Sequence, residues 1–137
     1  DIGGEAIDTI IEYTLPKGGP PALVFAEVRH AGGAMSRVDS NANAYSNRQA
    51  LYNLNMIALT PTPEMKTQAD GYSKKFLHDL GPHLTGGVYM NFVEGENMLE
   101  RTPEAYPAKT YQRLREIKTK YDPGNMLRFG FGIEPVD

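Results

Sequence analysis

The feature that most constrains this chain is an amphipathic segment near the C-terminus that stops at a strong turn signal. Apolar side chains recur at helical spacing from Tyr111 to Tyr121, and Pro107 stands where the first turn of such a helix begins. The next four residues, Asp-Pro-Gly-Asn at 122–125, favour a turn, because proline presets the backbone and glycine or asparagine tolerates a left-handed conformation. The pattern predicts a helix whose apolar face needs a packing partner. That inner face should carry Tyr111, Leu114, Ile117 and Tyr121.

The remaining patterns predict an α+β chain. Apolar spacing indicates a short helix over 6–13 and a longer one that begins after the N-cap Thr62 and ends at Gly81-Pro82. Strands are expected over 22–30, over part or all of 45–59, and over 88–93. On the second of these segments, Asn53 and Asn55 should point away from the apolar face. The fold class that follows is a largely antiparallel sheet of three or more strands covered by helices.

The composition is that of a globular protein. The 137 residues are 40% hydrophobic and 23% charged, which is enough to bury a core in one domain. The net charge of -3 argues against nucleic acid as a partner, and no cysteine is present for a disulfide or a thiolate site. Neither a membrane-spanning run nor a targeting signal is recognisable, so cytoplasm is the default expectation. The chain begins with Asp1 instead of methionine, which suggests a fragment.

Two pairs of polar residues on predicted strands are the first candidates for a site. Tyr89 and Asn91 lie two apart and therefore project from one face, where a phenol and a carboxamide could hold a polar ligand. Glu27 and Arg29 share a face of their strand in the same way. Each pair also has a structural explanation, which is a solvated sheet face for the first and an ion pair at a sheet edge for the second.

Two further basic residues are candidates, His30 and Arg48. A single histidine is more often structural than catalytic, and Arg48 could equally form a surface ion pair. The three histidines of the chain do not have metal-ligand spacing with carboxylates, so no metal site is predicted. Neither a glycine-rich nucleotide motif nor a Walker loop nor a Gly-x-Ser-x-Gly elbow occurs.

Two motifs resemble a known family. The helix from Arg113 to Lys120 with the Tyr-Asp-Pro-Gly-Asn turn at 121–125, joined to Tyr-Met-Asn-Phe at 89–92, is similar to the C-terminal end of the berberine-bridge-type FAD-linked oxidoreductases, of the vanillyl-alcohol-oxidase-type superfamily. The resemblance implies FAD as the cofactor. It also implies that the cofactor is held mostly by an N-terminal FAD-binding domain that is missing here.

The resemblance further implies roles for the candidate residues. Tyr89 and Asn91 would lie beside the flavin, with His30 as a further cofactor contact, and Tyr89 would be the catalytic residue. The substrate-binding residues would be Glu27, Arg29 and Arg48.

Phe92 is a departure from the family pattern. Carbohydrate oxidases of this family usually carry a tyrosine at that place, and it acts as the base that takes the substrate hydroxyl proton. Phenylalanine has no proton to exchange. Tyr89 or a residue outside this segment would then serve, or the substrate is not a sugar alcohol.

Two functions are compatible with these patterns. In the first, residues 1–93 are part of a substrate-binding domain and residues 94–137 are a berberine-bridge-like C-terminal segment, together forming one compact unit. That unit would belong to an enzyme that oxidises a small organic substrate by hydride transfer to flavin, and it would be inactive alone. Sheet faces left open by the missing domain would favour a homo-oligomer. In the second, the chain is a free-standing α+β binding or interaction module without catalysis.

Overall fold

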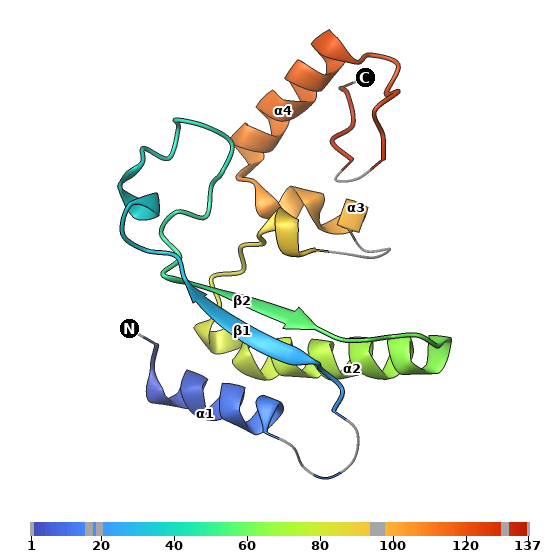
Figure 1. The fold of residues 1–137 in the computed structure, drawn as a ribbon. Helices are drawn as coiled ribbons and strands as arrows, with labels where there is room; N and C mark the ends of the chain where they lie inside the picture. The colour runs from blue at the N-terminus through green and yellow to red at the C-terminus, as the bar shows by residue number, and fades with distance from the viewer. Residues whose placement is uncertain (1, 16–17, 19–20, 94–97, 130–131, 137) are drawn as a thin grey trace. The chain divides into compact units, whose positions relative to one another are not determined.

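A computed structural model describes residues 2–15, 18, 21–93, 98–129 and 132–136 of the chain (Figure 1). The chain divides into two compact units. Unit 1 comprises Asp1–His30 and Leu51–Thr85, and unit 2 comprises Ala31–Ala50 and Gly86–Asp137. The polar loop expected at 94–97 lies outside the described residues.

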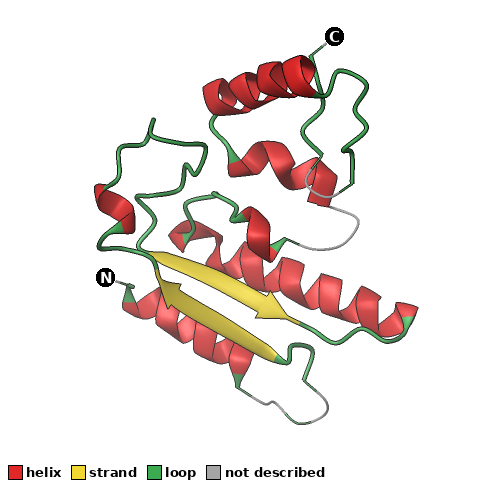
Figure 2. Cartoon of the chain, turned by 45° about the horizontal axis from the view of Figure 1, so that its top comes forward, coloured by secondary structure: helices red, strands yellow, loops and turns green. Residues whose placement is uncertain are grey.

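Unit 1 is a two-stranded sheet with two helices packed on one face. Its elements are α1 (Gly4–Thr14), β1 (Phe25–His30), β2 (Tyr52–Ile57), α2 (Pro63–Leu80) and the short 3-10 helix η2 (Gly81–His83). The strands pair antiparallel, with Glu27 opposite Asn55. Figures 1 and 2 show α1 and α2 running side by side beneath the sheet.

The α+β class predicted from the sequence is confirmed, and the extent of the sheet is smaller than predicted. The described residues form a sheet of two strands, not three or more. Within 45–59 only Tyr52–Ile57 is a strand, and the segment 88–93 contains the 3-10 helix η3 (Met90–Phe92) in place of a strand. A strand requires a hydrogen-bonded neighbouring strand, and neither of the two described strands pairs with 88–93.

The core of unit 1 is built where α1 meets α2. Phe76 is fully buried, and its ring stacks parallel on Tyr13 with 4.6 Å between the ring centroids. Ala6 and Leu80 are buried in the same cluster, and Leu54 packs against it from β2. The helical stripe predicted for α2 is therefore confirmed at its C-terminal end.

A polar network also links α1 to α2. The Tyr13 hydroxyl donates to the Asp79 carboxylate and accepts from Lys75 Nζ at 2.6 Å, and Lys75 also pairs with Asp79 at 2.8 Å. The hydrogen bond to the Asp79 carboxylate raises the pKa of Tyr13, while the bond from Lys75 lowers the pKa of Asp79. Tyr72 donates its hydroxyl proton to the Tyr13 carbonyl at 2.6 Å. Polar and aromatic contacts thus fix one end of α1 on α2.

The start of α2 follows the predicted capping chemistry. Thr62 accepts a hydrogen bond from the Met65 amide at 3.3 Å, and Pro63 occupies the first helical turn. The orientation expected for β2 agrees with the core contacts. Leu54 and Met56 pack against the core of unit 1, and Asn55 lies between them on the strand and therefore points to the other face. Asn55 is nevertheless buried, and its side chain bonds to Glu27 on the neighbouring strand.

Unit 2 is built from short helices and loops around a small core. Its elements are the 3-10 helix η1 (Met35–Arg37), η3, α3 (Met98–Arg101), the 3-10 helix η4 (Thr102–Ala105) and α4 (Ala108–Tyr121). Val88, Met90 and Ala105 form the buried cluster, with Tyr106 packed against it. The colouring of Figure 2 makes the high loop content of this unit visible.

The prediction for the covered face of α4 is wrong at its C-terminal end. Tyr111 and Leu114 are half-buried, whereas Ile117 and Tyr121, also expected on the inner face, are exposed, Tyr121 to 74%. Arg115 donates to the carbonyls of Glu134 and Pro135, and the Thr119 hydroxyl accepts from the Val136 amide at 2.7 Å. The C-terminal tail therefore covers a polar face of α4, and Ile117 and Tyr121 stay exposed.

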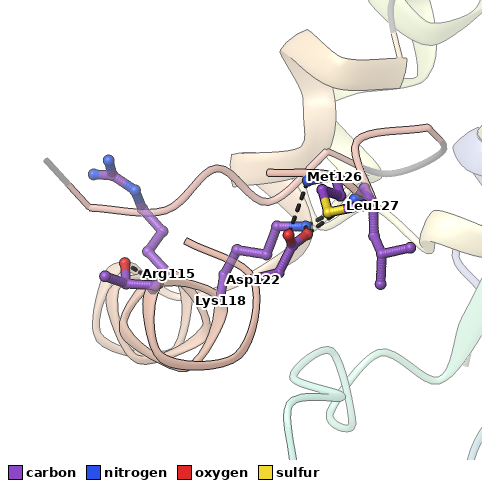
Figure 3. Close-up of polar contacts among 6 residues, drawn as sticks. Arg115, Lys118, Asp122, Met126 and Leu127 are labelled. Carbon is purple, nitrogen blue, oxygen red and sulfur yellow. Dashed lines mark hydrogen bonds and ion pairs between the residues drawn. The ribbon is translucent and has the colours of Figure 1, made fainter. Parts of the chain in front are cut away.

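Asp122 anchors the turn that follows α4 (Figure 3). Its two carboxylate oxygens accept from the backbone amides of Met126 and Leu127 at 2.8 and 2.9 Å, and Lys118 Nζ bonds to it at 2.5 Å. Lys118 also donates to the Leu127 carbonyl at 2.8 Å. The Lys118 bond is the largest cause that lowers the Asp122 pKa to about 2. The turn predicted at 122–125 is confirmed, and Asn125 takes the left-handed conformation with φ 48°.

Candidate functional site

The predicted site residues fall into both units. Arg48, Tyr89 and Asn91 belong to unit 2, and Glu27, Arg29 and His30 belong to unit 1. The contacts within each unit are described separately below.

A cavity of about 240 Å³ lies within unit 2. Two chain segments supply most of its wall, 44–47 and 88–91, and Ala105 and Tyr106 complete it. The lining carries three tyrosines and two asparagines, and no charged side chain. Such a wall can stack on a ring and hydrogen-bond to it, but it offers no cation to a phosphate.

Tyr89 is the centre of an aromatic cluster at this cavity. Its ring makes edge-to-face contacts with Tyr45 at 5.8 Å and Phe92 at 4.9 Å, measured between centroids. Asn91 Nδ2 donates to the Tyr89 hydroxyl at 2.8 Å. Tyr89 and Asn91 are thus close to each other, as predicted, but the shared strand face expected to bring them together is not present. The 3-10 turn of η3 brings the two side chains together, and no strand face is involved.

The hydroxyl of Tyr89 retains a proton that it can donate. A phenol has one O–H donor and can accept as well, and the bond from Asn91 uses only the accepting side. The Tyr89 hydroxyl is therefore equipped to exchange a proton with a molecule in the cavity.

Arg48 is buried behind this wall and is not part of the lining. Its Nη1 donates to the Met35 carbonyl at 3.2 Å, and its Nη2 donates to Asn43 Oδ1 at 2.8 Å. The guanidinium carbon lies 4.9 Å from the centroid of the Tyr45 ring. The surface ion pair considered for Arg48 is therefore not the arrangement that the described residues show.

Asn47 is a cavity residue that sequence reasoning missed. Its Nδ2 donates to the Val88 carbonyl at 3.1 Å and so joins the two lining segments. Asn47 lies in the segment 45–59, which was expected to contain a strand, and only the pairing of 44–47 with 88–91 distinguishes Asn47 from its neighbours. The flanking Gly87 leaves room for it, since a Cβ there would lie 2.5 Å from Asn47 Oδ1.

Replacing Gly87 with alanine should displace the Asn47 side chain and destabilise unit 2 by about 1 kcal/mol, the usual size of one lost hydrogen bond. The Asn47 side-chain amide resonances in an NMR spectrum should move with the substitution. Gly124→Ala is the matched control, because a Cβ at Gly124 meets nothing within 4 Å. Unchanged Asn47 resonances in the Gly87 variant would contradict the predicted clash.

The candidate residues of unit 1 pair with one another. Arg29 Nε lies 2.8 Å from Glu27 Oε2, and this bond is the main reason that the Glu27 pKa is lowered. The His30 ring lies 5.3 Å from the Tyr52 ring, in a tilted arrangement. The ion pair considered at the sequence level is therefore present. It leaves this face of the sheet polar, with no net charge from the pair.

Comparison with known proteins shows a family match that includes part of the cavity wall, residues 88–91 with Ala105 and Tyr106. Residues 88–134 match the sequence profile of a family described as berberine and berberine-like. Two relatives from Bacillus subtilis, uncharacterised FAD-linked oxidoreductases YvdP and YgaK, are 35% and 30% identical over 106 and 105 residues. Berberine bridge enzyme-like 17 of Arabidopsis thaliana is 27% identical over 121 residues.

The matches cover 76% of this chain for YvdP and 77% for the other two, and 23% of each relative. The chain therefore spans about a quarter of the length of the curated relatives that it matches. Within the described ranges, no helix is long and apolar enough to cross a membrane.

Proposed function

Because residues 88–134 belong to the berberine and berberine-like family, we propose that this chain is the C-terminal substrate-domain part of an FAD-linked oxidoreductase. The enzyme oxidises a small organic substrate by hydride transfer to the flavin. The observation that carries the proposal is the cavity that the family segment forms with residues 44–47, where Tyr89 contacts Tyr45 and bonds to Asn91. Redox chemistry of this kind needs a cofactor, and the protein supplies orientation and proton exchange.

The cavity suits one part of FAD and not the whole. Aromatic and carboxamide side chains fit the edge of a flat polar ring, with Tyr89 and Asn91 as the residues that would hold it. The phosphates need cations or converging backbone amides, and the uncharged lining lacks a cation. When bound, flavin accepts the hydride. The phosphates are then held by the N-terminal FAD-binding domain outside this chain.

Tyr89 is the proposed catalytic residue. Its hydroxyl accepts from Asn91, which orients the phenol, and its own proton remains free to exchange with the substrate. Phe92 packs edge-to-face on the Tyr89 ring, and its benzyl side chain offers neither a hydrogen bond nor a proton there. The absence of a hydroxyl at Phe92 favours a substrate other than a sugar alcohol.

The polar face of unit 1 is the proposed substrate side. Glu27 and Arg29 form a neutral pair that can exchange hydrogen bonds with substrate hydroxyl or amide groups. His30 is the proposed further cofactor contact. A direct contact between Arg48 and substrate stays a prediction, and the neutral partners of Arg48 favour a different role that is developed below.

The surface of α4 and its turn is the proposed docking surface for the missing FAD-binding domain. Tyr121, Met126, Leu127 and Phe129 are 74–87% exposed, and Asp122 holds the backbone of Met126 and Leu127 in place. A fixed loop that displays large apolar side chains marks an interaction site. The partner inferred is the remaining three-quarters of the polypeptide. Exposed apolar residues on the sheet, Phe25 and Ile57, would support self-association of the chain alone.

The test is the visible spectrum of the full-length protein that contains these residues. It should show flavin absorbance bands, and small alcohols, sugars and phenols are screened for bleaching of those bands. Tyr89→Phe should keep the flavin and slow its reduction by the identified substrate roughly 10²-fold or more, the range for loss of an acid or base. Tyr72→Phe is the matched control, because Tyr72 lies in unit 1 and its hydroxyl bonds to the Tyr13 carbonyl.

A colourless full-length protein would overturn the flavin proposal. It would favour the alternative, a free-standing α+β module that binds a partner through its exposed apolar residues. A Tyr89→Phe enzyme with an unchanged reduction rate would remove Tyr89 from the chemistry while leaving the cofactor assignment intact.

A further inference from the structure

Arg48 is a buried cation that pairs with no carboxylate of the described residues. It is 7% exposed, and its hydrogen bonds go to a carbonyl and a carboxamide, both neutral. Its Nε is buried with no hydrogen-bond partner. Burial of a charge is unfavourable unless the group is paired and fully hydrogen-bonded. An isosteric apolar side chain would avoid this cost, so the guanidinium is retained for what it contacts.

We propose that Arg48 is a positioning residue that fixes Tyr45 against Tyr89. The role deepens the proposed function, because it rests on Tyr89 as the residue at the reaction site. Arg48 itself touches neither the cavity nor a ligand and acts through Tyr45.

Arg48 first restrains the backbone of Tyr45, through Asn43. Asn43 Oδ1 accepts from Arg48 Nη2 at 2.8 Å and from the Tyr45 amide at 3.1 Å. One carboxamide oxygen therefore joins the guanidinium to the backbone of Tyr45. The other arm of the fork reaches the Met35 carbonyl, so the guanidinium binds the loop at two points, Met35 and Asn43. A planar guanidinium presents these two bonds from separate nitrogens in a fixed fork, whereas all donors of a lysine lie on one atom.

Arg48 also restrains the ring of Tyr45. The guanidinium carbon lies 4.9 Å from the ring centroid, the range of a cation–π contact. With one ring face occupied by Arg48, the ring is held in the orientation that presents its contact to Tyr89 at 5.8 Å and 90°. Backbone and ring are thus restrained by the same side chain.

Both restraints affect the cavity. Tyr45 and Tyr89 are both part of its wall, and Asn91 donates to the hydroxyl of Tyr89. If Tyr45 is released, Tyr89 loses one of its two edge-to-face neighbours and keeps only Phe92. The ring can then reorient, and the hydroxyl no longer has one defined position.

The test uses ¹⁹F NMR of the full-length protein labelled with 3-fluorotyrosine. The resonances of Tyr45 and Tyr89 are assigned with Tyr45→Phe and Tyr89→Phe. Arg48→Met should move or broaden both resonances by more than a linewidth, and Arg48→Lys should restore them only in part. Tyr52, which lies in unit 1, reports whether the fold is intact. Arg37→Met, at an exposed arginine of the same loop, should leave both resonances unchanged.

Asn43→Ala provides a second route, because Asn43 is exposed and its removal buries no new group. It should move Tyr45 and Tyr89 in the same sense as Arg48→Met. An Arg48→Met spectrum in which Tyr45 moves and Tyr89 stays would overturn the positioning role. So would a uniform change that includes Tyr52, since it would indicate a general structural role.

The flavin absorbance bands of the same samples distinguish a failure of the Arg48 positioning role from a failure of the proposed function. If flavin is bound and the Tyr89 resonance does not move in Arg48→Met, the role of Arg48 is rejected and the proposed function is retained. If the Tyr89 resonance moves in Arg48→Met but the protein contains no flavin, the role of Arg48 is supported and the proposed function is rejected.

Discussion

Replacing Phe76 with alanine should lower the free energy of unfolding of unit 1 by about 3–5 kcal/mol, the range for an aromatic side chain removed from a core. The side chain is 0% exposed, and its ring stacks on Tyr13. The neighbours come from α1, α2 and the sheet, so a cavity at Phe76 would loosen all three. A two-stranded sheet has little stability alone and depends on the helices that cover it.

Urea unfolding followed by circular dichroism measures this loss. Met65→Ala on the same helix is the matched control, because Met65 is exposed, and its change should stay within about 0.5 kcal/mol. A loss below about 1 kcal/mol for Phe76→Ala would mean that the α1 packing contributes little to the stability of unit 1.

Lowering the pH from about 4 toward 2 should release the turn after α4, an effect that depends on Asp122. Its pKa is lowered from the ordinary 3.8 to about 2, first by the bond from Lys118 and next by the Leu127 amide. A carboxyl whose pKa is depressed by folding contributes its stabilisation fully above its unfolded pKa and loses it as the pH falls through the folded value. Protection of the Met126 and Leu127 amides against hydrogen exchange should therefore fall across this window.

Asp122→Asn removes the charge and one of the two accepting oxygens. Protection of the Leu127 amide at neutral pH should fall roughly tenfold, the equivalent of one hydrogen bond to a charged group, and its dependence on pH below 4 should disappear. Asp70→Asn is the matched control, because Asp70 also pairs with a lysine four residues before it but lies on α2. Full protection of Leu127 at pH 2 would contradict the role assigned to Asp122.

The helices were predictable because their signals are local. The Thr62 cap and Pro63 in the first turn are adjacent in sequence, and the apolar spacing of α2 begins directly after them. The structure confirms the helix start that these signals predict. The same holds for the turn after α4, where Pro123 and Gly124 lead to the left-handed Asn125.

The strand prediction at 88–93 failed because strand formation is not local. Val88, Met90 and Phe92 alternate in a strand-like pattern, but a strand also needs a neighbour to complete its hydrogen bonds. In this chain, Val88 and Met90 are buried among short helices instead. The prediction for the covered face of α4 failed at Tyr121 for a related reason. The C-terminal tail packs on the polar face of the helix through hydrogen bonds to Arg115 and Thr119.

The closeness of Tyr89 and Asn91 was predictable, since two residues this near in sequence meet in more than one backbone conformation. The neighbours of Tyr89 were not. Tyr45 is 44 positions earlier in the chain, Asn47 reaches the Val88 carbonyl from the same distant loop, and Arg48 contacts Met35 and Asn43. No periodicity connects such segments.

The sequence by itself determined the longer helices α1, α2 and α4, the Thr62 cap, the closing turn and the family resemblance, because each is encoded in short runs of residue types. Only the tertiary structure decided that 44–47 and 88–91 form one cavity, that Arg48 contacts the Tyr45 ring, and that Ile117 and Tyr121 of α4 stay exposed. The physical reason is the same in each case. Contacts between distant segments depend on which packing buries the most apolar surface and satisfies the most polar groups, and that choice is made by the whole chain.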